Sequence, residues 1–188
     1  RRMLDYNRTA PSLVNSIVGP CMAVDIEKLK ALGLGADGFF FDQRFFFFFE
    51  ETDFCRRIIQ AGGKIVYQPQ AHLMHLQGES ANKRPVGARV QFQESRYKYF
   101  NKHYGAAAVA LLFAGTLLRT LVNAVVQTLA AVLTFWKQPN KAWDKAYVYW
   151  ALVLWHLLLC RPRWSFDKCC YRALKERPSE RNLSDGLS

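Results

Sequence analysis

Residues 45–57 read FFFFFEETDFCRR, and this stretch sets most expectations for the chain. Five consecutive phenylalanines predict a buried, strand-like run, and the residues from Glu50 onward predict a helix. Glu50, Glu51 and Asp53 then stand at the rim of a hydrophobic core. Carboxylates in such a place can have raised pKa values and can act as general bases near neutral pH. Acids in a first helical turn also complement the helix dipole, so a purely structural role is the alternative.

The flanking sequence alternates between strand-like and helical patterns, which predicts an α/β fold. The expected elements are strands at 21–24 and 64–69 and helices at 26–34, 50–61 and 89–104. Gly62 and Gly63 should end the second helix, and Pro69 should close the second strand.

The chain has 188 residues and a formal net charge of +11. Its basic residues cluster at 83–102 and 161–181, on either side of the most apolar region. This distribution favours a membrane surface as partner and predicts no nucleic-acid partner, since no DNA- or RNA-binding motif is present. The five cysteines form no C-x-x-C pair, which is typical of reduced thiols.

Residues 105–136 carry a single charge, Arg119, and a second apolar run covers 146–160. As one helix, the first run would be about 48 Å long, which exceeds a hydrocarbon core of roughly 30 Å. Polar residues repeat along it at helical spacing: Thr116, Arg119, Thr120, Asn123 and Gln127. Such a stripe suits a helix that lies in the membrane interface or packs on a partner better than a helix alone in lipid.

Three arrangements of these helices are open: two membrane spans, a hairpin lodged in one leaflet, or core helices of a soluble domain. A leaflet hairpin would keep every lysine and arginine on the cytoplasmic side, so the positive-inside rule favours it.

The order of motifs between 19 and 105 resembles the C-terminal half of the catalytic domain in family 2 glycosyltransferases, particularly their rhamnosyltransferase-like branch. The residues that carry the resemblance are Gly19, Phe41, Asp42, Phe45, Glu50, Glu51, Asp53, Cys55, Arg57, Gly62, Tyr67, Pro69, His75, Gly78 and Ser80. The segment YFNKHYG at 99–105 is similar to the one that follows in that branch.

The resemblance implies a partial GT-A (Rossmann-like) fold and an inverting transfer of sugar from a nucleotide-diphosphate sugar. A carboxylate would take the proton of an acceptor hydroxyl. By position this base is Glu51, where the family usually has Asp, and Glu50 and Asp53 are further candidates. Asp53 could instead cap the helix or pair with Arg57 four residues later.

The remaining site residues also come from the resemblance. His75 is expected near Mg²⁺ or Mn²⁺ and the diphosphate, although a surface histidine is the alternative. Gly19, Arg57, Gly78 and Ser80 are expected to bind substrate, although an ion pair would also explain Arg57.

The chain contains no D-x-D donor motif, so we expect it to be part of a longer enzyme. Its expected domains are the transferase half at 1–104, an apolar helical hairpin at 105–160 and a basic tail at 161–188. The expected acceptor is a glycan or a lipid-linked glycan, used in cell-surface polysaccharide synthesis at the cytoplasmic face of the inner or plasma membrane. The alternative is a non-catalytic remnant that docks on membranes or scaffolds partners.

Overall fold

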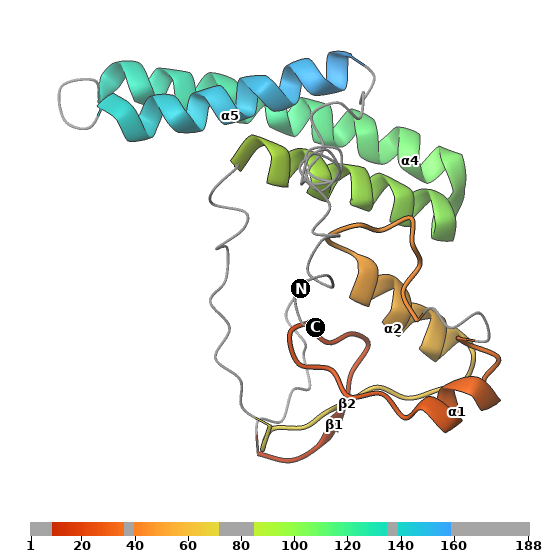
Figure 1. Ribbon diagram of the computed structural model, residues 1–188. Coiled ribbons are helices and arrows are strands. Elements are labelled where there is room, and N and C mark those ends of the chain that lie inside the picture. Colours follow the sequence, from red (N-terminus) through yellow and green to blue (C-terminus); the bar gives the residue numbers. More distant parts are fainter. Residues whose placement is uncertain (1–8, 36–39, 72–84, 135–138, 159–188) are drawn as a thin grey trace, which may run out of the picture. The chain divides into compact units, whose positions relative to one another are not determined.

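The structure of the chain is a computed structural model, and it describes residues 9–35, 40–71, 85–134 and 139–158 (Figure 1). The chain divides into two compact units. Unit 1 comprises residues 1–83 and 95–112, and unit 2 comprises residues 84–94 and 113–188. Each unit is described by itself.

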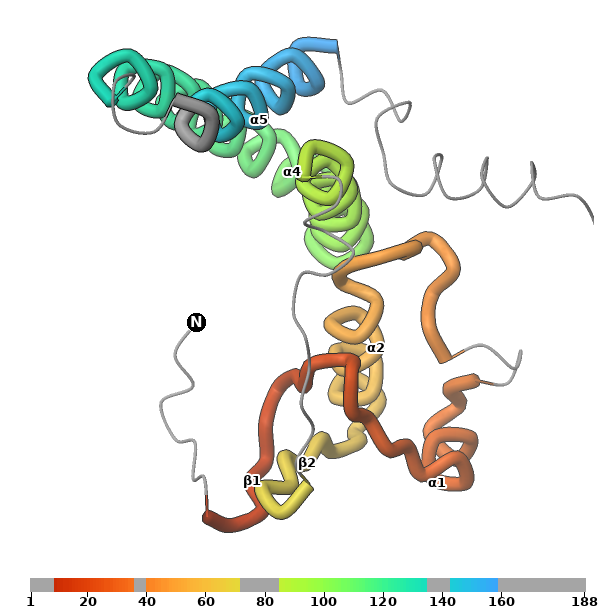
Figure 2. The backbone as a smooth tube through the Cα atoms, turned by 60° about the vertical axis from the view of Figure 1, so that its left-hand side comes forward, coloured from red at the N-terminus to blue at the C-terminus, as the bar shows by residue number. Residues whose placement is uncertain are grey.

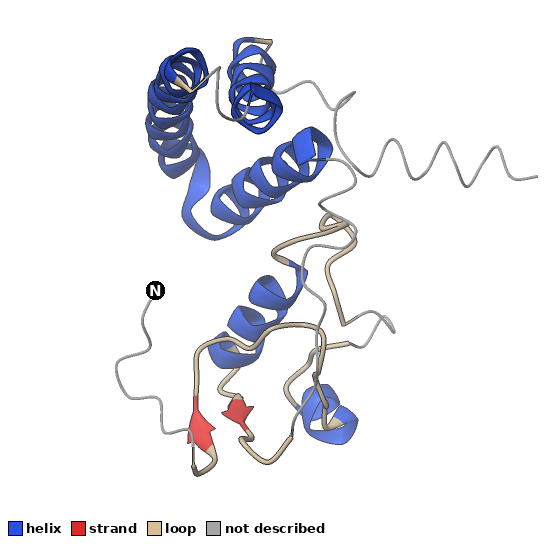
Figure 3. Cartoon of the chain, turned by 90° about the vertical axis from the view of Figure 1, so that its left-hand side faces the viewer, coloured by secondary structure: helices blue, strands red, loops and turns tan. Residues whose placement is uncertain are grey.

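The described chain is mostly helical, as Figure 3 shows. The helices are α1 (Ile26–Ala31), α2 (Glu50–Gln60), α4 (Pro85–Leu133) and α5 (Pro139–Leu157), and the strands are β1 (Ser12–Leu13) and β2 (Val66–Tyr67). The two strands pair antiparallel, with Ser12 opposite Tyr67 and Leu13 opposite Val66. The Val14 amide donates to the Ile65 carbonyl at 3.0 Å and prolongs the pairing.

The α/β expectation is therefore confirmed only in coarse form. Helices and a small sheet are present, and the apolar C-terminal region is helical, but the described residues contain no parallel, Rossmann-like sheet. The strand expected at 21–24 was wrong. Those residues lie outside any strand, and β2 pairs instead with β1, which comes earlier in the chain.

The strand-like reading of residues 45–49 was also wrong. These residues form bends, because Phe48 and Phe49 adopt positive φ angles of 65° and 68°. Left-handed backbone cannot continue a pleated strand, and it is rare for bulky side chains. Some of these phenylalanines are nevertheless packed: Phe45 is buried, and the Phe49 ring lies 5.3 Å from the Tyr99 ring, whereas Phe46 is exposed. The run thus contributes to the core of unit 1 without entering a sheet.

The two short helices of unit 1 agree with the sequence. The Asp25 side chain caps α1 by accepting from the Lys28 amide at 3.1 Å, which satisfies one of the free amides of the first turn. Helix α2 begins at Glu50 and ends where Gly62 takes a left-handed φ of 85°. Its buried face carries Phe54 and Cys55.

Helix α4 consists of two helical segments that meet at Gly105. This glycine has φ 81° and ψ 179°, a conformation open essentially to glycine alone. The helix expected at 89–104 is confirmed, and it lies within α4. Figure 2 shows α4 changing direction part-way along its length.

In unit 2, the later part of α4 and helix α5 lie side by side in both Figures 1 and 2. The Trp150 indole N–H of α5 donates to Oγ1 of Thr128 in α4 at 2.9 Å. Aromatic and cation contacts add to this packing. Phe113 lies 5.4 Å from the His156 ring, and the Arg89 guanidinium lies 5.1 Å from the Tyr149 ring centre.

Candidate functional site

The three predicted carboxylates lie in the first turn of α2, but their surroundings differ. Glu50 is half-buried, and its Oε2 atom is buried without a hydrogen-bond partner among the described residues. Burial raises the pKa of Glu50, and the neighbouring Glu51 carboxylate raises it further. Glu50 therefore holds its proton to higher pH than an ordinary glutamate does.

Glu51 is half-buried and lies beside Gly19, another predicted site residue. A Cβ atom placed on Gly19 would come within 3.8 Å of the Glu51 Cβ and 4.0 Å of its Cγ. The structure thus brings together two motifs that are 32 positions apart in the sequence. Within the described part of the chain, the Glu51 side chain makes no hydrogen bond or ion pair, so no described residue occupies its carboxylate.

Asp53 differs from Glu51 because it is fully buried and its carboxylate accepts several hydrogen bonds. Its Oδ2 accepts from Arg57 Nε at 2.9 Å and from Lys102 Nζ at 2.8 Å. Its Oδ1 lies 2.7 Å from His103 Nε2. Burial by itself would raise the pKa of Asp53, but the hydrogen bonds from Lys102, His103 and Arg57 outweigh burial and lower it. The donors around Asp53 thus favour its ionised form, and the carboxylate anchors the first turn of α2.

The role of Arg57 follows from its contact with Asp53. It pairs with Asp53 at the i,i+4 spacing foreseen from the sequence, and its guanidinium also donates to the Phe40 carbonyl. The ion-pair alternative for Arg57 is confirmed.

Asp42 extends the charged group. It accepts from Arg44 at 2.6 Å and from Lys102 Nζ at 2.7 Å. The Arg44 hydrogen bond holds the pKa of Asp42 well below its usual range, with Lys102 adding to the effect. Lys102 therefore bridges two carboxylates, one from the loop before α2 and one from α2 itself.

His103 completes the group as a neutral residue. Burial lowers its pKa, and this outweighs the raising effect of the hydrogen bond to Asp53. The contact is thus best described as a neutral imidazole Nε2–H that donates to the Asp53 carboxylate, and not as an ion pair. Neither His103 nor Lys102 was linked to Asp53 from the sequence, since no local pattern reports a contact across 49 or 50 positions.

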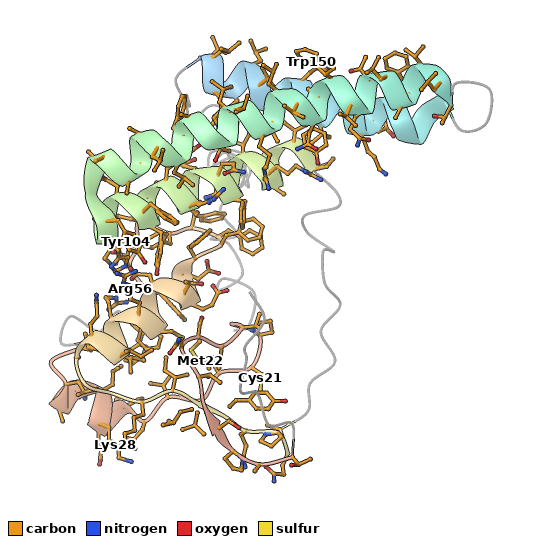
Figure 4. All side chains as sticks on the ribbon, turned by 180° about the vertical axis from the view of Figure 1, so that it is seen from behind. Cys21, Met22, Lys28, Arg56, Tyr104 and Trp150 are labelled. Carbon is orange, nitrogen blue, oxygen red and sulfur yellow. The ribbon has the colours of Figure 1, made fainter. Side chains whose placement is uncertain are left out.

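Residues 95–104 of α4 hold the loop and α2 at further points. Ser95 Oγ donates to the Phe47 carbonyl at 2.7 Å, and Lys98 Nζ donates to the Arg44 carbonyl at 3.1 Å. Arg56 of α2 donates to the Tyr104 hydroxyl at 2.5 Å, with its guanidinium 4.4 Å from the same ring centre. Figure 4 shows Arg56 and Tyr104 next to each other. These bonds stabilise the left-handed turn that positions Glu50 and Glu51.

Unit 1 also contains a cavity of about 680 Å³ between α1, α2 and the segments 22–25 and 62–66. Its walls are mainly apolar, with Met22, Leu29, Phe54 and Ile65 among them. Glu50, Glu51 and Asp53 do not line it, so the cavity is separate from the carboxylate group.

The metal expectation falls largely outside the described chain. Among the described residues, no group of three or more His, Cys, Asp and Glu side chains is placed to hold a metal ion. His75, Gly78 and Ser80 lie outside those residues. Mg²⁺ or Mn²⁺ binding therefore stays a prediction from the resemblance.

Comparisons with known proteins do not extend the resemblance. No protein-family model matches the chain, and neither a curated protein nor a solved structure matches it. The family assignment and the domain boundaries remain predictions.

Proposed function

We propose that the chain is a segment of an inverting, family 2-like glycosyltransferase, with Glu51 as general base. The observation that supports this most directly is the placement of Glu51: half-buried, uncommitted within the described chain, and against the backbone of Gly19. A substrate could approach a glycine backbone closely because no side chain stands in the way. A base must also be within hydrogen-bond reach of the proton it takes.

In the proposed reaction, the Glu51 carboxylate takes the proton of an acceptor hydroxyl. The hydroxyl oxygen forms a bond to the anomeric carbon of the sugar as the bond from that carbon to the diphosphate oxygen breaks. The nucleoside diphosphate leaves with the electron pair. A divalent metal ion, if bound, would neutralise charge on the diphosphate.

The surrounding residues have supporting roles in this proposal. Asp53 fixes the first turn of α2 through Lys102, His103 and Arg57, and so holds Glu51 in place without taking part in proton transfer. The nucleotide-diphosphate sugar, the glycan or lipid-linked acceptor and the cytoplasmic membrane face belong to the same proposal.

The test is sugar transfer by membranes that contain the natural-length protein. They are supplied with each of a panel of sugar-labelled nucleotide sugars, and label in extracted lipid and glycan is counted. Glu51→Gln should lower transfer by about 100-fold or more, the usual contribution of a general base. Glu51→Asp should retain most of it, because the carboxylate is preserved.

Glu27→Gln is the matched control, since Glu27 is an exposed glutamate on α1. It should leave transfer unchanged. If Glu51→Gln retains transfer within about threefold of the parent, Glu51 is not the base. If the parent transfers no sugar from the panel but still binds membranes, the docking or scaffold alternative gains support, which the exposed apolar surface of unit 2 already favours.

A further inference from the structure

Unit 2 exposes many large aliphatic side chains, while its interior contains small and polar side chains beside apolar ones such as Leu152 and Trp155. Thr116 and Thr120 of α4 are each only 4% exposed, and Ala124 and Ala131 are fully buried. Of the polar stripe noted in the sequence, Thr116 and Thr120 therefore face inward, whereas Arg119 is exposed. Other buried polar residues in this unit are Gln91, Gln93 and His156.

The outward surface of the same helices is apolar. On α4 it consists of Leu118, Leu121, Val122, Val125, Val126, Leu129, Val132 and Leu133. On α5 it consists of Trp143, Tyr147, Trp150, Leu154 and Leu157. Leu, Val and aromatic residues in such number are rarely left to water, whereas they are the usual surface of a helix in lipid.

Two features argue against a complete crossing of the bilayer. The uncharged stretch 146–160 would reach about 22 Å as a helix, which is short of a hydrocarbon core of roughly 30 Å. Arg119 is exposed and stands 14 residues after Gly105 and 14 before Leu133. A spanning helix over 106–133 would bring this guanidinium near the bilayer centre, the most costly position for a charge.

The exposed charges of unit 2 indicate which lipids it would bind. Arg89, Arg119 and Lys145 are exposed cations of unit 2, and the whole chain has a formal net charge of +11. Cations beside an apolar surface complement the phosphates of anionic lipids. Aromatic residues such as Trp150 on the same surface are typical of the boundary between headgroups and acyl chains.

We propose that unit 2 is an anionic-lipid anchor that enters one leaflet without crossing the bilayer. The outward faces of α4 and α5 lie among the acyl chains, and Arg119 reaches the headgroup phosphates. Length and composition alone would let α4 cross a membrane, so the commitment to one leaflet rests on Arg119 and on the short apolar part of α5. This inference is independent of glycosyl transfer.

Flotation with vesicles tests the surface. The protein should float with vesicles of phosphatidylcholine and phosphatidylglycerol at 7:3, and more weakly with phosphatidylcholine alone or in high salt. Val122→Asp should reduce the bound fraction roughly tenfold, because a carboxylate on a lipid-facing site is expensive. The matched control is Val18→Asp, which makes the same change at a 70% exposed valine of unit 1, against 53% for Val122. Equal loss in both variants, or a stable oligomer with no flotation, would overturn the proposal.

Trypsin added outside the same vesicles tests the topology in the unmodified protein. Lys137 follows the end of α4 and precedes α5 in the sequence. With the protein bound from outside, an anchor in one leaflet leaves this site on the outer side, so fragments ending at Lys137 should form without detergent. Protection at Lys137 until detergent is added would show that the hairpin crosses the bilayer.

Discussion

The His103 imidazole and the Asp53 carboxylate meet at 2.7 Å although they are 50 positions apart in the chain. Asp53 is fully buried, and Lys102 and Arg57 also donate to it. Through these bonds, the end of the first segment of α4 holds the first turn of α2. Asp53, one of the two further candidates for the base, is thus the acid that holds this turn in place.

Removing the Asp53 charge should destabilise unit 1. Asp53→Asn leaves Arg57 without its carboxylate partner and Lys102 with Asp42 alone, and loss of one partner from a buried ion pair costs about 3 kcal/mol. Hydrogen–deuterium exchange of residues 50–60 would report this locally as faster exchange. Asp144→Asn is the control, because Asp144 is exposed on α5 and should change nothing measurable. Unchanged exchange in Asp53→Asn would contradict the anchoring role.

Acid should loosen the same region through His103. Its folded-state pKa is lowered, so the neutral imidazole stabilises the fold above the unfolded value of about 6.5, and this stability is lost as the pH falls from there. The carboxylates of Asp53 and Asp42 titrate at lower pH because their pKa values are also lowered. Exchange measured at pH 7 and pH 5 should show the loss, and His103→Gln should remove most of the pH dependence.

The pH dependence of stability that comes from Glu50 should be opposite to that from His103. Its pKa is raised in the folded state, so its contribution is favourable below the unfolded pKa and is lost as the pH rises through the folded value. Glu50→Gln should therefore raise the melting temperature at pH 7, and this gain should shrink toward pH 4. Glu27→Gln, at an exposed site, provides the baseline. A gain of equal size at both pH values would show that charge is not its cause.

The bend in α4 should depend on glycine at position 105. Its backbone conformation is closed to side-chain-bearing residues, so Gly105→Ala should destabilise the bend by about 1–3 kcal/mol. Gly115→Ala makes the same change at an open site inside the helix, where alanine is the better helix former by up to about 1 kcal/mol. Thermal unfolding should thus shift in opposite directions. A shift in the same direction for both variants would argue against a required glycine conformation.

Local rules in the sequence were enough to determine several features of this protein. The start of α2 at its acids and its end before Gly62 both follow from residue preferences that act over a few positions. The i,i+4 pair of Asp53 and Arg57 is equally local.

Other features were decided only by the tertiary structure, because they depend on contacts between residues that are far apart in the sequence. The phenylalanines of 45–49 looked like a strand, but bonds from Ser95 and Lys98 hold their loop in bends with left-handed residues. Asp53 and Glu51 were both candidate bases by sequence, yet of the two only Asp53 receives hydrogen bonds from Lys102 and His103. The polar stripe of α4 was readable as a pattern, but only the packing of unit 2 decided that Thr116 and Thr120 are buried while Arg119 is exposed. The spacing of polar residues identifies a helix face but not its neighbours.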